Sequence, residues 1–301
     1  MSNAGTASSG TLALAVPAPP GERRVRVPWP LYLSGLFVGL LAVIALAAPL
    51  LVPHNPERGS LRARLKGPTL EAPDGKAYLL GTDQLGRDVL SRMVFGTRVS
   101  LTIGFAAVAV GGLVGGLLGL VAGFRGGWVD EVVMTVADAQ LAFPFILLAI
   151  GIIAVLGPSF PNLIIVVGLS GWVTYARVLR SQVLSLRQRD FVSAILGLGG
   201  SVPRVLVRHI LPNVASTFMV IATLELARAI VLEATLSFLG LGIQPPTPSW
   251  GGMIQEGREY LDSAWWISVF PGALLMLTSF VVSRTGDWLR DVLDPTLRGG
   301  S

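Results

Sequence analysis

Six apolar stretches, each long enough to cross a lipid bilayer as a helix, dominate this sequence. They lie near residues 30–52, 99–123, 132–156, 160–180, 214–237 and 264–284. A helix needs about 20 apolar residues to span the hydrocarbon core of a bilayer. Only 14% of the residues are charged, whereas a typical soluble domain carries about 25%. We therefore predict an all-α fold, a polytopic membrane bundle of six transmembrane helices.

Both ends of the chain are expected on the cytoplasmic side. Residues 1–28 are rich in Ser, Ala, Gly and Pro, a composition that predicts a disordered tail. Arg23, Arg24 and Arg26 precede the first span and place its N-terminus inside by the positive-inside rule. That span is too long for a signal-peptide core of about 7 to 15 residues. Six spans then return the C-terminus to the cytoplasm.

Two further parts follow the tail. Residues 29–98 hold the first transmembrane helix and an external polar segment, and residues 99–301 form a core domain with a cytoplasmic loop at 181–213. The external segment fits the charge rule poorly, because it carries eight Lys or Arg residues against five acids. Within it, we expect a helix that begins at a cap on Thr82 or Asp83 and that pairs Asp88 with Arg92.

Several kinds of chemistry are excluded by what the chain lacks. It has no cysteine and only His54 and His209, so we expect no thiol catalysis and no metal site. The net charge of +5 comes from residues beside the spans, where membrane orientation explains it better than nucleic acid does. The only lysines are Lys66 and Lys76, and neither precedes Ser or Thr. A phosphate-binding loop is therefore missing, and an ATP-driven step must occur on another chain.

The stretch from 187 to 213 is basic and regular, which suggests a docking element. Its first helix has an apolar face at helical spacing, made by Phe191, Ala194, Ile195 and Leu198. Gly199 and Gly200 end that helix, and a second helix opens at Ser201 and Pro203 and closes at Pro212. The apolar face of the second helix is Val202, Leu206 and Ile210. Such a pair fits a groove in another protein, and the alternative is a loop lying on lipid headgroups.

Four of the charged residues inside the predicted spans are candidates for a function: Asp138, Glu225, Arg228 and Glu233. Charges at membrane depth usually face a bundle interior or a watered cavity. We expect these four to line a translocation path, with Glu225 and Arg228 spaced to pair on one helix face. Structural ion pairs without a transport role are the alternative. A repeat of glycines at small-xxx-small spacing from Gly111 to Gly123 predicts close helix packing.

The loop after the fifth span is expected to lie outside and to turn sharply. Gly240, Gly242 and three prolines between 245 and 248 prevent a regular helix. The lone Gly-x-Gly does not indicate a nucleotide site, because no strand precedes it.

Motifs along the chain resemble those of one family. The strings DFVSA from Asp190 and HILPN from His209 flank Gly199 and resemble the EAA loop in permease subunits of bacterial binding-protein-dependent ABC importers. Ser193 stands where that family usually has Glu. The strings GTDQLGRDVLSRMVFGTRVSL from Gly81 and EATLSFLGLGIQPPTPSWGG from Glu233 are similar to strings in the C-type subunits of dipeptide, oligopeptide and nickel permeases.

The resemblance implies a type I importer permease fold in the bacterial cytoplasmic (inner) membrane. It implies an ATP-driven importer of di- or oligopeptides or nickel chelates, with no cofactor on this chain. The implied partners are a homologous second permease, two ATPase subunits that hold ATP and Mg, an extracytoplasmic solute-binding protein and the bilayer. The implied ATPase-coupling residues are Asp190, Phe191, Ser193, Ala194, Gly199, Arg208, His209, Leu211 and Pro212. The implied receptor-side residues are Gln244, Pro245 and Trp250.

Two other functions compete with this interpretation. An intramembrane enzyme could use Asp138, Glu225 and Glu233 as acids or metal ligands, but no histidine or cysteine lies in a predicted span to complete a nucleophile and base. An ATP-independent channel or carrier would need no docking loop. Mutation of Glu225 and Glu233 would distinguish the importer from the enzyme, and recovery of an ATPase with the purified chain would distinguish it from the channel or carrier.

Overall fold

The structure, a computed structural model, describes residues 29–293. Its α-helices are α1 (Trp29–Leu51), α2 (Val89–Arg125), α3 (Gly127–Ala142), α4 (Phe145–Leu156), α5 (Phe160–Arg187), α6 (Asp190–Gly197), α7 (Val202–Val205), α8 (Leu211–Phe238), α9 (Trp250–Gly257), α10 (Leu261–Ala264) and α11 (Trp266–Leu293). A π-helical turn, Leu206–Ile210, joins α7 to α8. Within the described residues, β-structure is limited to two isolated bridges. The predicted tail at 1–28 lies outside this range.

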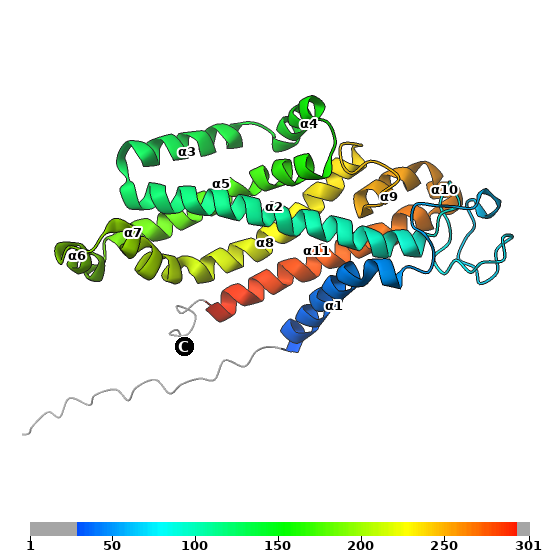
Figure 1. Cartoon of the computed structure of the whole chain (residues 1–301), viewed down its shortest axis with the longest axis horizontal. Coiled ribbons are helices and arrows are strands. Elements are labelled where there is room, and N and C mark those ends of the chain that lie inside the picture. Colours follow the sequence, from blue (N-terminus) through cyan, green and yellow to red (C-terminus); the bar gives the residue numbers. More distant parts are fainter. Residues whose placement is uncertain (1–28, 294–301) are drawn as a thin grey trace, which may run out of the picture.

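Five helical segments in residues 29–293 are long and apolar enough to cross a membrane. They are α1, α2, α5, the continuous run Val202–Phe238 and α11. A sixth crossing is present if α3 and α4 count as one broken span. The predicted all-α, multi-span membrane fold is thus confirmed. In Figure 1 these helices run roughly along the long axis of the molecule.

The centre of the bundle is the pair α2 and α5, which share the most extensive helix contact. One face of α2 carries buried glycines that lie against the backbone of α5. A Cβ added at Gly115 would stand 2.1 Å from the carbonyl oxygen of Trp172, and one added at Gly119 would stand 2.5 Å from that of Ala176. Small residues let helix backbones approach closely where lipid supplies no hydrophobic drive. The predicted packing role of this glycine repeat is confirmed.

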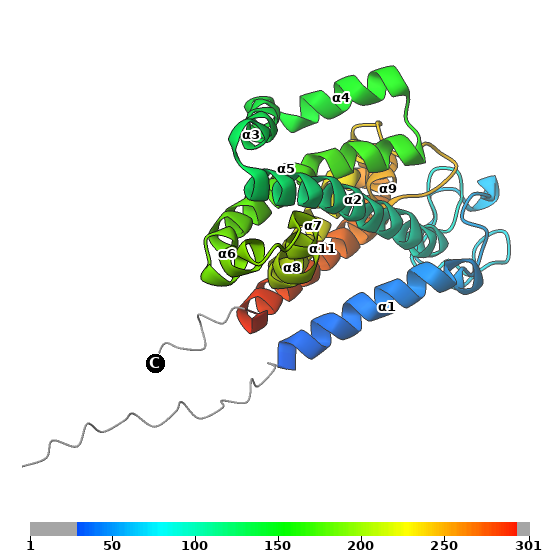
Figure 2. The same ribbon diagram turned by 60° about the vertical axis from the view of Figure 1, so that its left-hand side comes forward.

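Other helices cover this pair on both sides. In both views α3 and α4 lie on one side of α2 and α5, while α11 and α1 lie on the other (Figures 1 and 2). Helix α8 packs against α2, α5 and α11. Buried side chains of α2, α4, α5 and α8 form the main apolar core, including Val99, Ile153, Leu163 and Leu236.

The span predicted near 132–156 is not a single straight helix, because the chain bends by 93° between α3 and α4. The cause is Pro144, which has no backbone N–H and disfavours helical geometry in the preceding residue. Phe143 is accordingly extended, with φ −101° and ψ 139°.

The helix predicted from Thr82 or Asp83 begins later, at Val89. Asp88 is its N-cap and accepts a hydrogen bond of 3.1 Å from the backbone N–H of Ser91. Gly86 adopts a φ of 71°, a left-handed geometry that interrupts any helix across residues 82–88. The predicted pair of Asp88 with Arg92 does not form, because the Asp88 carboxylate serves as the cap. The predicted domain boundary at residue 98 falls inside α2.

Pro212 does not end the second helix of the 187–213 stretch, contrary to the prediction. The helix continues from α7 through the π-turn into α8, with Pro212 in the first turn of α8. Proline lacks the N–H and crowds the carbonyl four residues earlier. A π-turn just before it changes that hydrogen-bond pattern, so the chain passes the proline while staying helical.

Different elements lie at the two ends of the long axis of the molecule. The end with α6 and α7 lies opposite the end with residues 53–88, α9 and α10 (Figure 1). The elements that the sequence assigns to opposite membrane faces therefore lie at opposite ends of the bundle.

Candidate functional site

The α6 segment, defined here as residues 188–205, projects from the end of α5 (Figure 1). Gly199 reverses the chain after α6 with a φ of 85°, a geometry that favours glycine. Val192 and Val205 are buried, at 1% and 0% exposed, against Leu179 and Val183 of α5. The segment is therefore held against α5 and the start of α8 by its own apolar core.

The predicted apolar faces of this segment are only partly right. Ile195, Leu206 and Ile210 do pack inward. Phe191, Leu198 and Val202, by contrast, are 38%, 89% and 42% exposed. Val192 and Val205, which were not predicted to face inward, are the buried residues instead. The two helices are short and the chain reverses between them, so helical spacing identified an apolar face without showing which side faces inward.

The other predicted coupling residues lie at the same end of the molecule. His209 is half-buried, with its ring 6.5 Å from that of Phe191. The remaining members are exposed: Asp190, Ser193, Ala194, Gly199, Arg208, Leu211 and Pro212.

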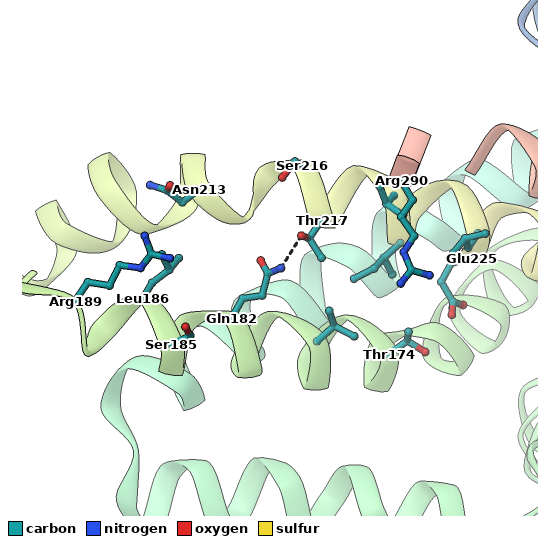
Figure 3. Close-up of a pocket in the computed structure, with 14 residues that line it drawn as sticks. Thr174, Gln182, Ser185, Leu186, Arg189, Asn213, Ser216, Thr217, Glu225 and Arg290 are labelled. Carbon is teal, nitrogen blue, oxygen red and sulfur yellow. Dashed lines mark hydrogen bonds between the residues drawn. The ribbon is translucent and has the colours of Figure 1, made fainter. Parts of the chain in front are cut away.

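A cavity of about 780 Å³ lies between α5, α8 and α11 (Figure 3). Six polar uncharged side chains line it: Thr174, Gln182, Ser185, Asn213, Ser216 and Thr217. Gln182 donates a hydrogen bond of 2.7 Å to Thr217, which links α5 to α8 inside the cavity. Arg189, Glu225 and Arg290 supply its charges, with Arg189 at the α6 end and the other two at the opposite end (Figure 3).

Glu225 and Arg228 form the pair that their spacing predicts, at 3.4 Å. The side chain of Glu225 is 11% exposed and that of Arg228 is 51% exposed. Arg228 lines a second cavity of about 560 Å³, together with residues of the α3–α4 junction and α11. Leu224 borders both cavities. The ion pair therefore lies where the two cavities meet.

Glu233 is not brought to either cavity. It is fully buried, and Ser237 donates a hydrogen bond of 2.7 Å to its Oε1. Ser249 of the following loop lies 3.4 Å from Ser237, so this carboxylate joins α8 to the start of α9. Such enclosed packing favours a structural role for Glu233, without a transport function, over a position on the translocation path.

Asp138 is likewise outside both cavities. It pairs with Arg177 across α3 and α5, and both side chains are largely exposed, at 66% and 45%. The sequence thus grouped four charged residues that the structure divides among three places, and only Glu225 and Arg228 lie together.

The three residues predicted on the receptor side do not share one environment. Gln244 and Pro245 are exposed in the loop between α8 and α9, and Gln244 donates to the carbonyl oxygens of Gly240 and Gly242 at 3.1 and 3.0 Å. Trp250 is fully buried, and its indole N–H donates to the carbonyl oxygen of Met93 at 3.3 Å. A side chain so enclosed offers no surface to a receptor, so Trp250 is a core residue that fixes α9 on α2.

Sequence reasoning missed a buried ion-pair cluster at the same end. Arg87 bridges Asp83 and Glu256, at 2.6 Å to each. Arg92 contacts the same two carboxylates and lies 2.9 Å from Glu256. The sequence shows Asp83, Arg87 and Arg92 close together, but Glu256 lies more than 160 residues away. Only the fold reveals that α9 completes the cluster.

The pKa of Tyr78, in the segment between α1 and α2, is raised by burial and by its hydrogen bond of 2.7 Å to Asp74. Tyr78 also pairs with Thr69 through the backbone, so this interaction stabilises a small hairpin-like turn in the segment between α1 and α2.

Comparison with known proteins identifies the family. Residues 115–299 match the family described as binding-protein-dependent transport system inner membrane component. The chain is 41% identical to the dipeptide transport system permease protein DppC of Alkalihalophilus pseudofirmus, over 87% of this chain and 86% of that protein. It is 40% identical to the di/tripeptide transport system permease protein DppC of Pseudomonas aeruginosa, over 88% of each. It is 38% identical to the glutathione transport system permease protein GsiD of Pectobacterium atrosepticum, over 92% of this chain and 94% of that protein. With this likeness and its long apolar helices, the chain belongs to the family of binding-protein-dependent transport system inner membrane components, as a multi-pass membrane permease.

Proposed function

We propose that this chain is the permease subunit of an ATP-driven importer of short peptides. The observation that carries the proposal is the α6 segment, whose apolar side chains stand exposed at one end of the bundle while its inner residues are fixed to α5. The substrate class follows from relatives named for dipeptides, di/tripeptides and glutathione. These names favour short peptides over nickel chelates.

The working assembly contains this chain, a homologous second permease, two ATPase subunits and an extracytoplasmic solute-binding protein. ATP and Mg bind on the ATPase subunits, since this chain has no phosphate-binding loop. The α6 segment and both termini face the cytoplasm. The exposed arginines at that end, Arg187, Arg189, Arg204 and Arg208, support this orientation because basic residues concentrate on the cytoplasmic side.

The α6 segment couples the ATPase to the pore. Phe191, Leu198 and Val202 supply exposed apolar surface for an ATPase groove. The buried contacts of Val192 and Val205 with α5 tie the segment to the helices that line the larger cavity. A displacement of the segment therefore moves those helices. ATP binding to the ATPase subunits can then stabilise one state of the pore over the other.

The translocation path follows the two cavities along α8. The larger cavity lies toward the α6 segment, and the second lies beyond the pair of Glu225 and Arg228. Charges inside a span commonly line a watered route, and Leu224 is the side chain common to both cavities. Closing one cavity while the other opens yields alternating access. The exposed Gln244 and Pro245 are the receptor-side contacts.

The test is purification of the whole transporter from cells that carry the Leu198→Asp variant. A carboxylate at this exposed apolar position should prevent ATPase subunits from co-purifying and should abolish ATP-driven uptake of Ala-Ala in proteoliposomes with the receptor present. Leu61→Asp is the matched control, since Leu61 is also a highly exposed leucine, at 75%, and lies at the opposite end. Full ATPase recovery and uptake in the Leu198→Asp complex would refute the coupling role.

A further inference from the structure

Glu225 is a nearly enclosed carboxylate with a poor partner. Its two oxygens receive only long contacts from Arg228, at 3.4 and 3.5 Å. Charge-assisted hydrogen bonds usually measure about 2.7–2.9 Å. The partner is itself half exposed, so it is free to turn toward water in the second cavity. A carboxylate withdrawn from water needs a close cationic partner, and in this structure Glu225 lacks one.

The position of this carboxylate is built into the fold. A Cβ added at Gly171 would lie 2.9 Å from Glu225 Oε2 and 3.9 Å from the ring of Tyr175. The absence of a side chain at Gly171 thus makes room for the carboxylate against α5. The hydroxyl of Tyr175 is buried and has no hydrogen-bond partner among the described residues, which adds an unused polar group on the same side of α8.

The cavity that Glu225 borders suits a small zwitterion. Its volume of about 780 Å³ lies in the range of about 300–1,000 Å³ found for small-molecule sites. Arg290 of α11 reaches the same end of the cavity as Glu225 (Figure 3), and it forms no ion pair within residues 29–293. One end of the cavity therefore presents an anion and a cation to the same ligand.

We propose that Glu225 binds the terminal ammonium group of a short peptide in the larger cavity, while Arg290 binds its terminal carboxylate. This inference rests on the proposed function, since it assumes that peptides enter this cavity. An ammonium group carries three donors and can approach Glu225 more closely than Arg228 does. The ammonium group of the ligand replaces Arg228 as the partner of the Glu225 carboxylate, and Arg228 then faces the second cavity. Recognition is then confined to the two charged termini, and the peptide side chains face the uncharged wall, which includes the apolar Val178, Val220 and Ile221 beside its polar residues.

The test measures peptide binding directly, without requiring transport. The natural chain has no cysteine, so Thr174→Cys places one thiol in this chain on the cavity wall near Glu225 (Figure 3). The complete transporter in nanodiscs is treated with a fluorescent maleimide, and this chain is separated from its partners before its labelling rate is read. Ala-Ala should slow labelling about tenfold, as expected when a charge-assisted contact holds a ligand in place. N-acetyl-Ala-Ala, which lacks the ammonium, should not slow it.

Variants at residue 225 complete the experiment. Glu225→Gln should abolish protection by Ala-Ala and Glu225→Asp should restore part of it, because only the second keeps a carboxylate. Glu259→Gln, which alters an exposed acid outside the cavities, should leave protection unchanged. Equal protection by Ala-Ala and its N-acetyl derivative, unchanged protection in Glu225→Gln, or no protection by either peptide would overturn the site. ATP-driven uptake of Ala-Ala by the natural transporter alongside any of these results would leave the importer intact and refute only the ammonium site.

Discussion

Arg92 and Glu256, 164 residues apart in the chain, meet through two hydrogen bonds of 2.9 and 3.1 Å. The pair joins the start of α2 to α9. The side chain of Arg92 is 2% exposed and that of Glu256 is 13% exposed, so the interaction is protected from water. The bundle is thereby tied together at the end opposite the α6 segment.

Breaking this cluster should destabilise the permease strongly. Glu256→Gln would leave Arg87 and Arg92 with one shared carboxylate, and loss of one partner from a buried ion pair costs about 3–5 kcal/mol. Asp138→Asn is the matched control, because Asp138 and Arg177 are largely exposed and such pairs contribute about 0–1 kcal/mol. Thermal unfolding in detergent should show a clear fall in Tm for the first variant alone. Equal Tm values would mean that the cluster contributes little.

Gly115→Ala should separate α2 from α5. The added methyl group would stand 2.1 Å from the carbonyl oxygen of Trp172, and overpacking of this kind costs about 1–3 kcal/mol. Gly39→Ala in α1 meets nothing within 4 Å and should be neutral or mildly stabilising, since alanine favours helix more than glycine. Yield and Tm of the two purified variants give the comparison. A normal Tm for Gly115→Ala would show that the helix pair can shift without cost.

Gly199→Ala should weaken coupling without removing the α6 segment. Its φ of 85° is strained for any residue with a Cβ, at a cost of about 1–2 kcal/mol, although no atom lies within 4 Å of the added carbon. We expect Ala-Ala uptake per ATP hydrolysed to fall at least about fivefold. Gly197→Ala also meets nothing within 4 Å and lacks the positive φ, so its uptake should match that of the natural transporter. A loss in both variants would point away from the backbone at 199.

Alkaline pH should loosen the segment between α1 and α2. The folded chain raises the pKa of Tyr78 by burial and by its hydrogen bond to Asp74. Below about pH 10, the ordinary tyrosine pKa, the phenol is protonated in both folded and unfolded states. Above it the unfolded state loses the proton first, so stability falls as pH rises. Limited proteolysis of this segment between pH 8 and 11 should show increasing cleavage, and Tyr78→Phe should remove that residue's share of the pH dependence.

The sequence predicted the helical membrane class and the approximate positions of the long helices, because apolar length and glycine spacing are local signals. It did not predict all of their ends, since α2 begins ten residues before the predicted span and α11 ends nine residues after it. The glycine repeat on α2 and the pair of Glu225 with Arg228 required only helical periodicity. The break at Pro144 was locally visible too, but the apolar run on both sides outweighed the proline in the prediction. At Pro212 the error was the reverse. The prediction ended the helix at this proline, but a π-turn just before it lets the helix continue.

The remaining failures concern contacts between distant segments. Glu233 was expected to line the path and Trp250 to lie on the receptor side, yet α8, α9 and α2 enclose both of them. No sequence pattern singled out Arg290, and the packing of α11 on α8 brings it to the cavity. No periodicity within a single helix could have revealed these neighbours.

The helical run from Val202 to Phe238 is continuous through its π-turn, so it can transmit a rotation along its length. Its N-terminal end follows the chain reversal at Gly199, and Glu225 lies about 35 Å from that end at a rise of about 1.5 Å per residue. A tilt of about 10° at that end would swing that carboxylate by about 6 Å over this length, more than the reach of a hydrogen bond. One small rotation would therefore be enough to release a held ligand, with no second signal needed along the helix.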